Sequence, residues 1–312
     1  MEVPLEKLHF KSFIHLYHAR SFSSSINRAI YKLKKHYPNL LSLYEIGRSI
    51  QGTPILALYL GSGPIKLLIH GTHHAREAIT TILILDQIQY LIGLYQKNTC
   101  IQDLSICTLL KQVTFVFVPL VNPDGADLVL NGETAISTKY KNCSYLQEKL
   151  FPSWKANIRG VDLNENYPTR YPAPNLNSSP SYQLYPGLYP FSEPETLALK
   201  RLTEKDLFAG TISYHSSGEE IYWYYNQENT QRDLTIAQQI AQLTNYKLIP
   251  KKLPTTGSGY KDWFIETYHQ PSLTIEIAPY IGPKKVPKKF YPYIFYKNKD
   301  VPIVFARFIC SP

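Results

Sequence analysis

Cysteine is scarce in this chain, and the few cysteines form no recognised motif. Only Cys100, Cys107, Cys143 and Cys310 occur among the 312 residues, and no two of them stand in a C-x-x-C pair. This spacing excludes a zinc knuckle and a thiol redox motif. Free thiols and one or two disulfides both stay open, with Cys100 and Cys107 spaced to close a short loop.

Targeting and membrane signals are also lacking. The N-terminus begins Met1-Glu2-Val3-Pro4 without an apolar run, so no secretory signal is recognisable. The most apolar stretch, 79–95, is interrupted by Asp86 and Gln87 and is short for a bilayer. We therefore expect a soluble protein with no membrane partner, and the missing signal favours the cytoplasm.

A nucleic-acid motif is missing as well, although the chain is basic. The net charge is +9, from 33 Lys and Arg against 24 Asp and Glu, but the basic residues are spread along the chain from Lys32 to Lys289. Most of them are expected on solvated faces, and we expect no nucleic-acid partner. A polyanionic substrate would still be attracted by this field.

Hydrophobic residues are abundant enough for a large core. They make up 44% of the chain, and no internal repeat divides it. Runs 65–70 and 113–121 are largely apolar without strict alternation, which is typical of strands buried on both faces, and 78–95 between them is expected to be a helix. This βαβ unit predicts an α/β fold, with residues 1–22 as an N-terminal extension and 23–312 as a single domain.

The remaining pattern predicts further elements around this unit. Residues 122–190 are rich in Pro, Asn, Ser and Tyr and are expected to form a long irregular functional loop. Ser192-Glu193-Pro194-Glu195 has a capping pattern that predicts a helix through Thr203. The other expected elements are helices 23–37, 234–243 and 301–309 and strands 42–46, 55–60, 211–214, 220–225 and 273–277.

One short motif has the composition of a catalytic zinc site. His74-Ala75-Arg76-Glu77 lies on the turn between a predicted strand and a predicted helix, and His215 follows on another strand. Two imidazoles and a carboxylate can hold zinc while the fourth position stays open for water, which points to a metallohydrolase. His70 and His73 are rivals for His74, but only His74 has a carboxylate three residues later.

Seven short motifs then occur in the order seen in zinc carboxypeptidases, and the chain resembles that family from about Tyr31 to about Phe308. The resemblance implies a three-layer α/β/α sandwich around a mixed, mostly eight-stranded sheet, with one Zn²⁺ per chain at the strand ends. The motifs span residues 46–49, 74–77, 122–125, 160–164, 192–195, 213–216 and 274–276.

The resemblance also assigns the central roles. It makes His74, Glu77 and His215 the zinc ligands, and it makes Glu276 the general base that takes a proton from water and delivers it to the leaving amine. Glu276 stands in an otherwise apolar strand, where a charge without a function would be costly.

Four further residues have roles that the resemblance implies. Asp162 matches the carboxylate that orients the first zinc-binding histidine, although a turn-capping role is an equal alternative. Arg76 matches a substrate-binding arginine. Lys155 lies where relatives place the arginine that stabilises the tetrahedral oxyanion, and Arg159 is a rival for that role.

Two departures from the family concern the substrate. Carboxypeptidases carry Asn-Arg-Asn, whose arginine binds a terminal carboxylate, whereas this chain has Asn164-Glu165-Asn166. Glu165 should therefore attract an amine. The segment 257–263 aligns with a Gly-Ser-x-Asp-Trp motif and puts Lys261 at the floor of the specificity pocket, so the pocket is expected to be zwitterionic. The family's mobile tyrosine aligns near Pro254, and Tyr260 is its candidate substitute.

An amine and a carboxylate beyond the cleaved bond describe diaminopimelate in bacterial peptidoglycan. Residues 154–164 resemble the γ-D-glutamyl-L-diamino acid endopeptidase branch of the family, so the expected partner is a muropeptide. The alternatives are a carboxypeptidase that removes ordinary C-terminal residues, acidic ones included, and a non-catalytic binding protein. The cell wall or the spore is the alternative to the cytoplasm, and the oligomeric state stays open.

Overall fold

The computed structural model describes residues 5–8, 10–101, 103–147, 150–251 and 259–310. Eight strands of this part form one mixed sheet with the order β1-β2-β6-β3-β7-β10-β8-β9. Their bounds are β1 Leu41–Arg48, β2 Pro54–Gly61, β3 Ile65–Gly71, β6 Val113–Val118, β7 Gly210–Ser216, β8 Glu220–Tyr222, β9 Lys247–Leu248 and β10 Ser272–Ile277. The expected eight-stranded mixed sheet is confirmed.

The centre of the sheet is parallel. Strand β3 pairs in parallel with β6 on one side and with β7 on the other, and β7 pairs in parallel with β10. The outer pairs β1–β2, β2–β6 and β8–β10 are antiparallel. Because parallel strands end at the same edge of a sheet, residues that follow β3, β7 and β10 are brought together there.

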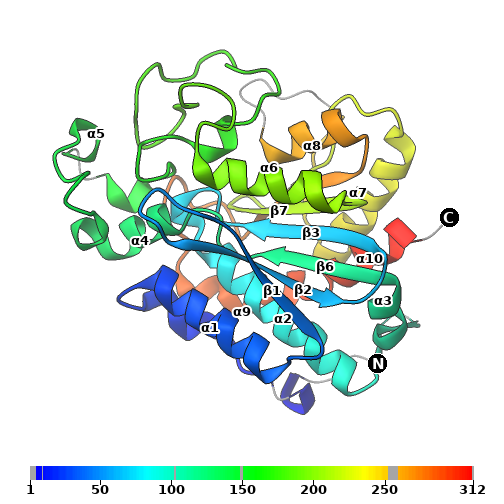
Figure 1. The fold of residues 1–312 in the computed structure, drawn as a ribbon. Helices are drawn as coiled ribbons and strands as arrows, with labels where there is room; N and C mark the ends of the chain where they lie inside the picture. The colour runs from blue at the N-terminus through cyan, green and yellow to red at the C-terminus, as the bar shows by residue number, and fades with distance from the viewer. Residues whose placement is uncertain (1–4, 9, 102, 148–149, 252–258, 311–312) are drawn as a thin grey trace.

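Helices cover both faces of the sheet (Figure 1). One hydrophobic cluster combines side chains of α1, α2, α7, α9 and α10 with the sheet, and a second combines those of α6 and α8 with its other face. The expected three-layer α/β/α arrangement is confirmed. The helices span α1 Phe22–His36, α2 Ile79–Gln96, α3 Ile106–Gln112, α4 Pro123–Asn131, α5 Ser144–Gln147, α6 Pro194–Asp206, α7 Thr230–Thr244, α8 Tyr260–Tyr268, α9 Tyr291–Asn298 and α10 Val301–Cys310.

Helix α2 lies in the helical layer that also contains α1, α7, α9 and α10. Within the described chain, the helical run Ala75–Gln96 is the one segment that is long and apolar enough to cross a membrane by length and composition, and it is longer than the sequence pattern suggested. However, 89% of its most apolar window is buried inside the protein. Its hydrophobicity is therefore accounted for by packing between the sheet and neighbouring helices.

Two expectations about the segment between β6 and α6 are wrong. Residues 122–190 are not irregular throughout, because α4 begins directly after Asn122, whose side-chain oxygen accepts a hydrogen bond from Gly125 N at 3.0 Å. Asn at the cap followed by Pro at the first position is a helix-start signal. Ser192 does not cap α6: the cap position is Glu193, and the Ser192 hydroxyl donates to the Glu193 carboxylate instead.

Several other helices and strands end a few residues before or after the predicted position. Strand β6 ends at Val118, β8 ends at Tyr222, and α6 continues to Asp206. Helices α8 and α9 were not expected, because each is short and begins among aromatic residues whose pattern does not distinguish helix from strand.

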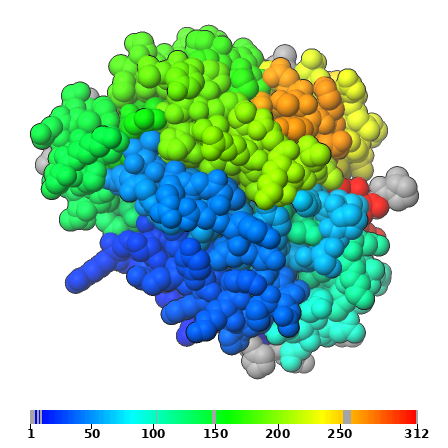
Figure 2. Space-filling view, in the orientation of Figure 1, coloured from blue at the N-terminus to red at the C-terminus, as the bar shows by residue number. Residues whose placement is uncertain are grey.

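The N-terminal segment packs on the same core as the rest of the chain, because Leu8 and Tyr17 belong to the hydrophobic cluster that α1, α2 and the sheet form. On the face seen in Figure 2, the blue N-terminal part of the chain adjoins the cyan part that follows it. Its 3-10 helix η2, Phe13–His18, buries Tyr17, whose hydroxyl donates to Val286 O at 2.9 Å. The division at residue 22 stays a prediction about folding units. Asp86 of α2 fastens this segment by accepting from Phe13 N at 2.8 Å and from the hydroxyls of Ser12 and Tyr291.

The Asp86 carboxyl should make stability depend on pH. Burial raises its pKa to about 6 even though three hydrogen bonds oppose the rise. The folded state therefore keeps a proton that the unfolded state releases near pH 4, and this contribution to stability is lost as pH rises through about 6. Urea unfolding at several pH values should show that Asp86→Asn removes up to about 3 kcal/mol of this dependence.

The control is Asp103→Asn, which changes an exposed carboxyl. Its unfolding free energy should follow the wild-type pH dependence. If Asp86→Asn also follows the wild type between pH 4 and pH 6, Asp86 does not hold a proton in the folded protein.

Candidate metal centre

The metal motif lies at the edge where the parallel strands end. His74 follows β3 and precedes the 3-10 turn η3, Ala75–Glu77, which leads into α2. His215 is on β7, and Glu276 lies beside it in the parallel register of β10. Three chain segments far apart in sequence thus deliver their side chains to one place.

Three donor side chains converge there. His74 Nδ1 lies 2.9 Å from Glu77 Oε1, His215 Nδ1 lies 3.1 Å from Glu77 Oε2, and the two Nδ1 atoms are 3.0 Å apart. Ligands around a tetrahedral zinc at about 2.1 Å would lie roughly 3.4 Å from each other. The spacing and the donor types fit zinc. Among the described residues, these three side chains have ligand atoms that all lie within 4.8 Å of one another, close enough to hold one ion.

Glu77 is the electrostatic centre of the group. Burial opposes its charged form, but His74 and His215 outweigh burial and lower the Glu77 pKa well below its usual range. Ser216 N also donates to Glu77 Oε2 at 3.1 Å. The carboxylate is therefore charged and fixed, as a metal ligand must be.

The two rival histidines point elsewhere. His70 Nε2 bonds to Ser213 Oγ at 3.0 Å, and His73 Nε2 bonds to Tyr167 OH at 2.9 Å. Both rings are fully buried, and burial lowers both pKa values, so they are neutral core histidines.

Glu276 has the acidity of a general base at neutral pH. Burial and the nearby Glu77 charge raise its pKa to about 7, although His215 and Lys155 oppose the rise. A carboxyl with this pKa can both accept and return a proton near pH 7. Its position beside His215 agrees with the role that the sequence implied.

Asp162 lies behind His74. Its Oδ1 is 3.4 Å from His74 Nε2, which is longer than a well-formed hydrogen bond, and its Oδ2 is 3.0 Å from Lys155 Nζ. Asp162 also accepts from Leu184 N at 3.0 Å and from Asn164 N at 3.3 Å. Asp162 therefore caps the turn that begins at Leu163, whereas its role in orienting His74 stays a prediction.

Lys155 and Arg159 have different surroundings. Burial disfavours the charged form of Lys155, but Asp162, Glu165 and Glu77 outweigh it and raise the Lys155 pKa. Arg159 Nη2 instead pairs with Glu193 Oε2 at 2.8 Å. Lys155 thus belongs to the charge system of the metal site, whereas Arg159 is engaged by Glu193.

Arg76 and Asn164 each contact a segment distant in sequence. Arg76 Nη1 donates to Ser153 O at 2.9 Å and so connects the metal motif to the 3-10 turn Phe151–Ser153. Asn164 lies in the 3-10 turn η6, Leu163–Glu165, against Gly259, where any Cβ would overlap the side-chain amide of Asn164. Glycine is required at that position for the two segments to meet.

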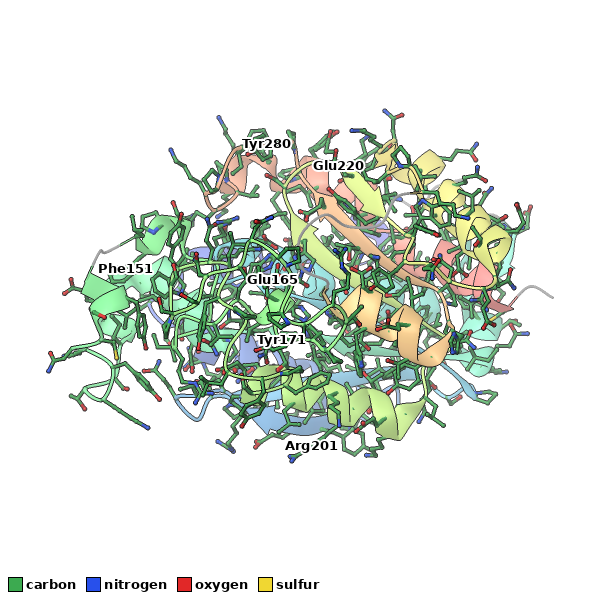
Figure 3. All side chains as sticks on the ribbon, turned by 90° about the horizontal axis from the view of Figure 1, so that it is seen from above. Phe151, Glu165, Tyr171, Arg201, Glu220 and Tyr280 are labelled. Carbon is green, nitrogen blue, oxygen red and sulfur yellow. The ribbon has the colours of Figure 1, made fainter. Side chains whose placement is uncertain are left out.

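Glu165 is nearly buried and lies in the middle of the view from above the molecule (Figure 3). Burial raises its pKa to about 7; Asp162 and Asp262 add to the rise and Lys155 opposes it. Its Oε2 atom has no hydrogen-bond partner. This side chain can therefore accept a hydrogen bond from a cationic group and would gain from doing so.

Lys261 and Tyr260 are not placed as the sequence suggested. Lys261 forms an ion pair with Asp262 and donates to Tyr224 O at 3.2 Å, so its charge is already balanced. Tyr260 is a core residue with 1% exposure, and its hydroxyl bonds to Thr203 Oγ1 at 2.8 Å. A role as a mobile substrate-binding tyrosine is wrong for it. Pro254, Gly257 and Ser258 lie outside the described residues.

Asn122 is a positioning residue whose role the sequence did not reveal. Its side-chain nitrogen donates to His73 O at 3.0 Å and to Ala156 O at 3.1 Å. Asn122 therefore joins the metal motif, the start of α4 and the Lys155 loop. The Asn-Pro-Asp-Gly motif marked Asn122 in the sequence. The two carbonyl groups to which its side chain donates are more than thirty residues away, so the sequence did not identify them.

Comparison with known proteins gives consistent matches. The profile of the zinc carboxypeptidase family matches residues 26–281. Gamma-D-glutamyl-L-diamino acid endopeptidase 1 of Lysinibacillus sphaericus is 33% identical over 260 residues, which is 81% of this chain and 64% of that protein. The protein YqgT of Bacillus subtilis is 31% identical over 284 residues, or 89% of this chain and 75% of its own length.

A solved structure shows the same fold. Bovine thrombin-activatable fibrinolysis inhibitor superposes with a TM-score of 0.72 at 20% identity and covers 92% of this chain and 96% of its own. At that identity the similarity concerns the fold alone. The chain spans less than two thirds of the length of the endopeptidase that it matches.

The three-donor geometry predicts which histidines hold zinc. After dialysis against zinc, elemental analysis should find one zinc per wild-type chain, and His215→Ala should weaken zinc binding by more than the roughly 10–100-fold typical of losing a group behind a ligand. The matched control is His73→Ala, which removes a buried imidazole that bonds to Tyr167. Equal zinc loss from both variants would contradict the assignment.

Proposed function

The chain belongs to the zinc carboxypeptidase family, and from this premise we propose that it is a zinc peptidase that hydrolyses the γ-D-glutamyl-diamino acid bond of peptidoglycan peptides. The observation that carries the substrate class is the buried Glu165 carboxyl, whose Oε2 has no partner. A terminal carboxylate placed there would meet another acid, whereas an ammonium group would be held by it.

The family relationship supports the same substrate class. The Lysinibacillus sphaericus protein that is 33% identical carries the name of a γ-D-glutamyl-L-diamino acid endopeptidase. A diamino acid supplies a free amine beyond the cleaved bond, which is the group that the Glu165 site requires. A muropeptide therefore satisfies the charge of the site better than an ordinary C-terminus.

The residues of the site divide the hydrolysis between them. His74, Glu77 and His215 would hold the zinc, which would supply polarisation of the scissile carbonyl and a water acidic enough to react near pH 7. Glu276 accepts the proton of the attacking water and returns it to the leaving amine. Lys155 provides positive charge for the developing oxyanion, although a lysine lacks the two-pronged geometry of an arginine.

The alternatives are less well supported by this arrangement. A carboxypeptidase specific for acidic termini would need the charge of Lys261, but Asp262 already pairs with it. A binding protein without activity would not need the Glu276 carboxyl held at a pKa of about 7 beside a complete set of metal ligands.

Glu276→Gln should slow turnover strongly while zinc stays bound. We expect a loss of roughly 10²–10⁴-fold in kcat for the tripeptide L-Ala-γ-D-Glu-meso-diaminopimelate, because an amide cannot accept the proton. Mass spectrometry of the products measures the rate. The control is Glu220→Gln, opposite Glu276 in the antiparallel register with β8, which should keep activity within a few fold. Unchanged turnover in Glu276→Gln would rule out its role as the base.

Glu165 should decide between an amine and a carboxylate in the substrate. We expect Glu165→Gln to weaken cleavage of the same tripeptide, because the amide offers no charge to the amine, without creating activity on a peptide with C-terminal Glu. Glu165→Arg should shift preference toward the C-terminal Glu peptide. The ratio of kcat/KM for the two substrates is the readout, and a ratio that neither variant changes would show that Glu165 does not select the substrate.

A further inference from the structure

A cavity lies away from the metal centre. It has a volume of about 510 Å³ and is lined by residues of η2, α1 and α2. Helices α1 and α2 lie on the face of the sheet opposite α6, as Figure 1 shows. None of the residues that hold or surround the metal lines it. A volume of this size is within the roughly 300–1,000 Å³ of small-molecule sites.

The floor of the cavity is apolar. Phe13 and Leu16 of η2 meet Ala29 and Leu33 of α1, and Ala29 and Leu33 are themselves buried. Such a surface next to solvent favours the binding of an apolar group, because binding removes that surface from water.

The rim of the cavity is basic. Arg28, Lys32 and His36 follow each other at intervals of four along α1 and so share one face of the helix, and His15 faces them from η2. No acidic side chain is among the described residues that line the cavity. Within the described part of the chain, neither Arg28 nor Lys32 forms an ion pair. Two like charges at this spacing repel each other unless an anion lies between or above them.

The walls are fixed before any ligand binds. Phe13 N donates to Asp86 Oδ1 at 2.8 Å, which anchors η2 on α2. Ser12 caps η2 by accepting from Ile14 N at 3.1 Å, and Arg28 Nη2 donates to Ser25 Oγ at 2.9 Å. A preformed site of this kind loses little entropy when it is occupied.

We propose that this cavity binds a small amphipathic organic anion. The apolar body lies on the floor formed by Phe13, Leu16, Ala29 and Leu33, and the anionic group lies between Arg28 and Lys32. Charge on the rim alone would describe a solvated helix face, but the combination with an apolar hollow beneath it fits a ligand that has both properties. This site is separate from the peptidase site and does not rest on the proposed function.

The test uses naphthalene-2-sulfonate as the probe and calorimetric titration of the full chain as the readout. We expect a dissociation constant on the order of 1 mM or tighter, as suits a ligand of this size. The uncharged methyl naphthyl sulfone and inorganic sulfate should each bind at least about tenfold more weakly, because each keeps only one of the two features.

Matched variants locate the site. Lys32→Gln should weaken probe binding about tenfold, whereas Lys35→Gln, an exposed lysine of the same helix outside the cavity, should leave it unchanged. Ala29→Phe should reduce binding by filling the floor, and thermal unfolding confirms that each variant is folded. Absence of probe binding, equal binding of the uncharged sulfone, or equal effects of the two lysine variants would each overturn the proposal.

Discussion

The structure depends on one constraint, which is that a buried carboxylate must be compensated where the parallel strands end. Glu77 lies between His74 and His215 and is charged only because both imidazoles and Ser216 N face it. The same geometry leaves three donors directed at one point, which is what a divalent metal requires. Asp162 lies beside His74, and Glu276 on β10 lies beside His215 and is influenced by the charge of Glu77.

The surrounding charges form two connected systems. Lys155 and Asp162 neutralise each other beside the metal ligands, and Lys261 and Asp262 do so at the start of α8. Burial, together with Asp162 and Asp262, raises the pKa of Glu165 to about 7, although Lys155 opposes the rise. A positive group beside Glu165 would therefore be favourable, which supports the substrate class that we propose.

The N-terminal segment gives the molecule a second feature of its own. Asp86, the one charged residue of α2, holds η2 on α2. The hollow between η2 and α1 combines a basic rim with an apolar floor. An acid in the middle of α2 is therefore a structural anchor, and the segment before residue 22 shares the core of the domain that follows.

The sequence by itself determined the family, the α/β class and the candidate metal ligands, because the motifs that carry His74, Glu77 and His215 follow or lie on strands that apolar runs reveal. It could not determine the partners of side chains, since Lys261 with Asp262, Tyr260 with Thr203 and Asn122 with the Lys155 loop meet only after folding. Motif position predicts a residue's place in the fold, but charge and burial depend on neighbours distant in the chain. Tertiary structure alone therefore decided which charges are balanced and which buried oxygens, like Glu165 Oε2, have no hydrogen-bond partner among the described residues.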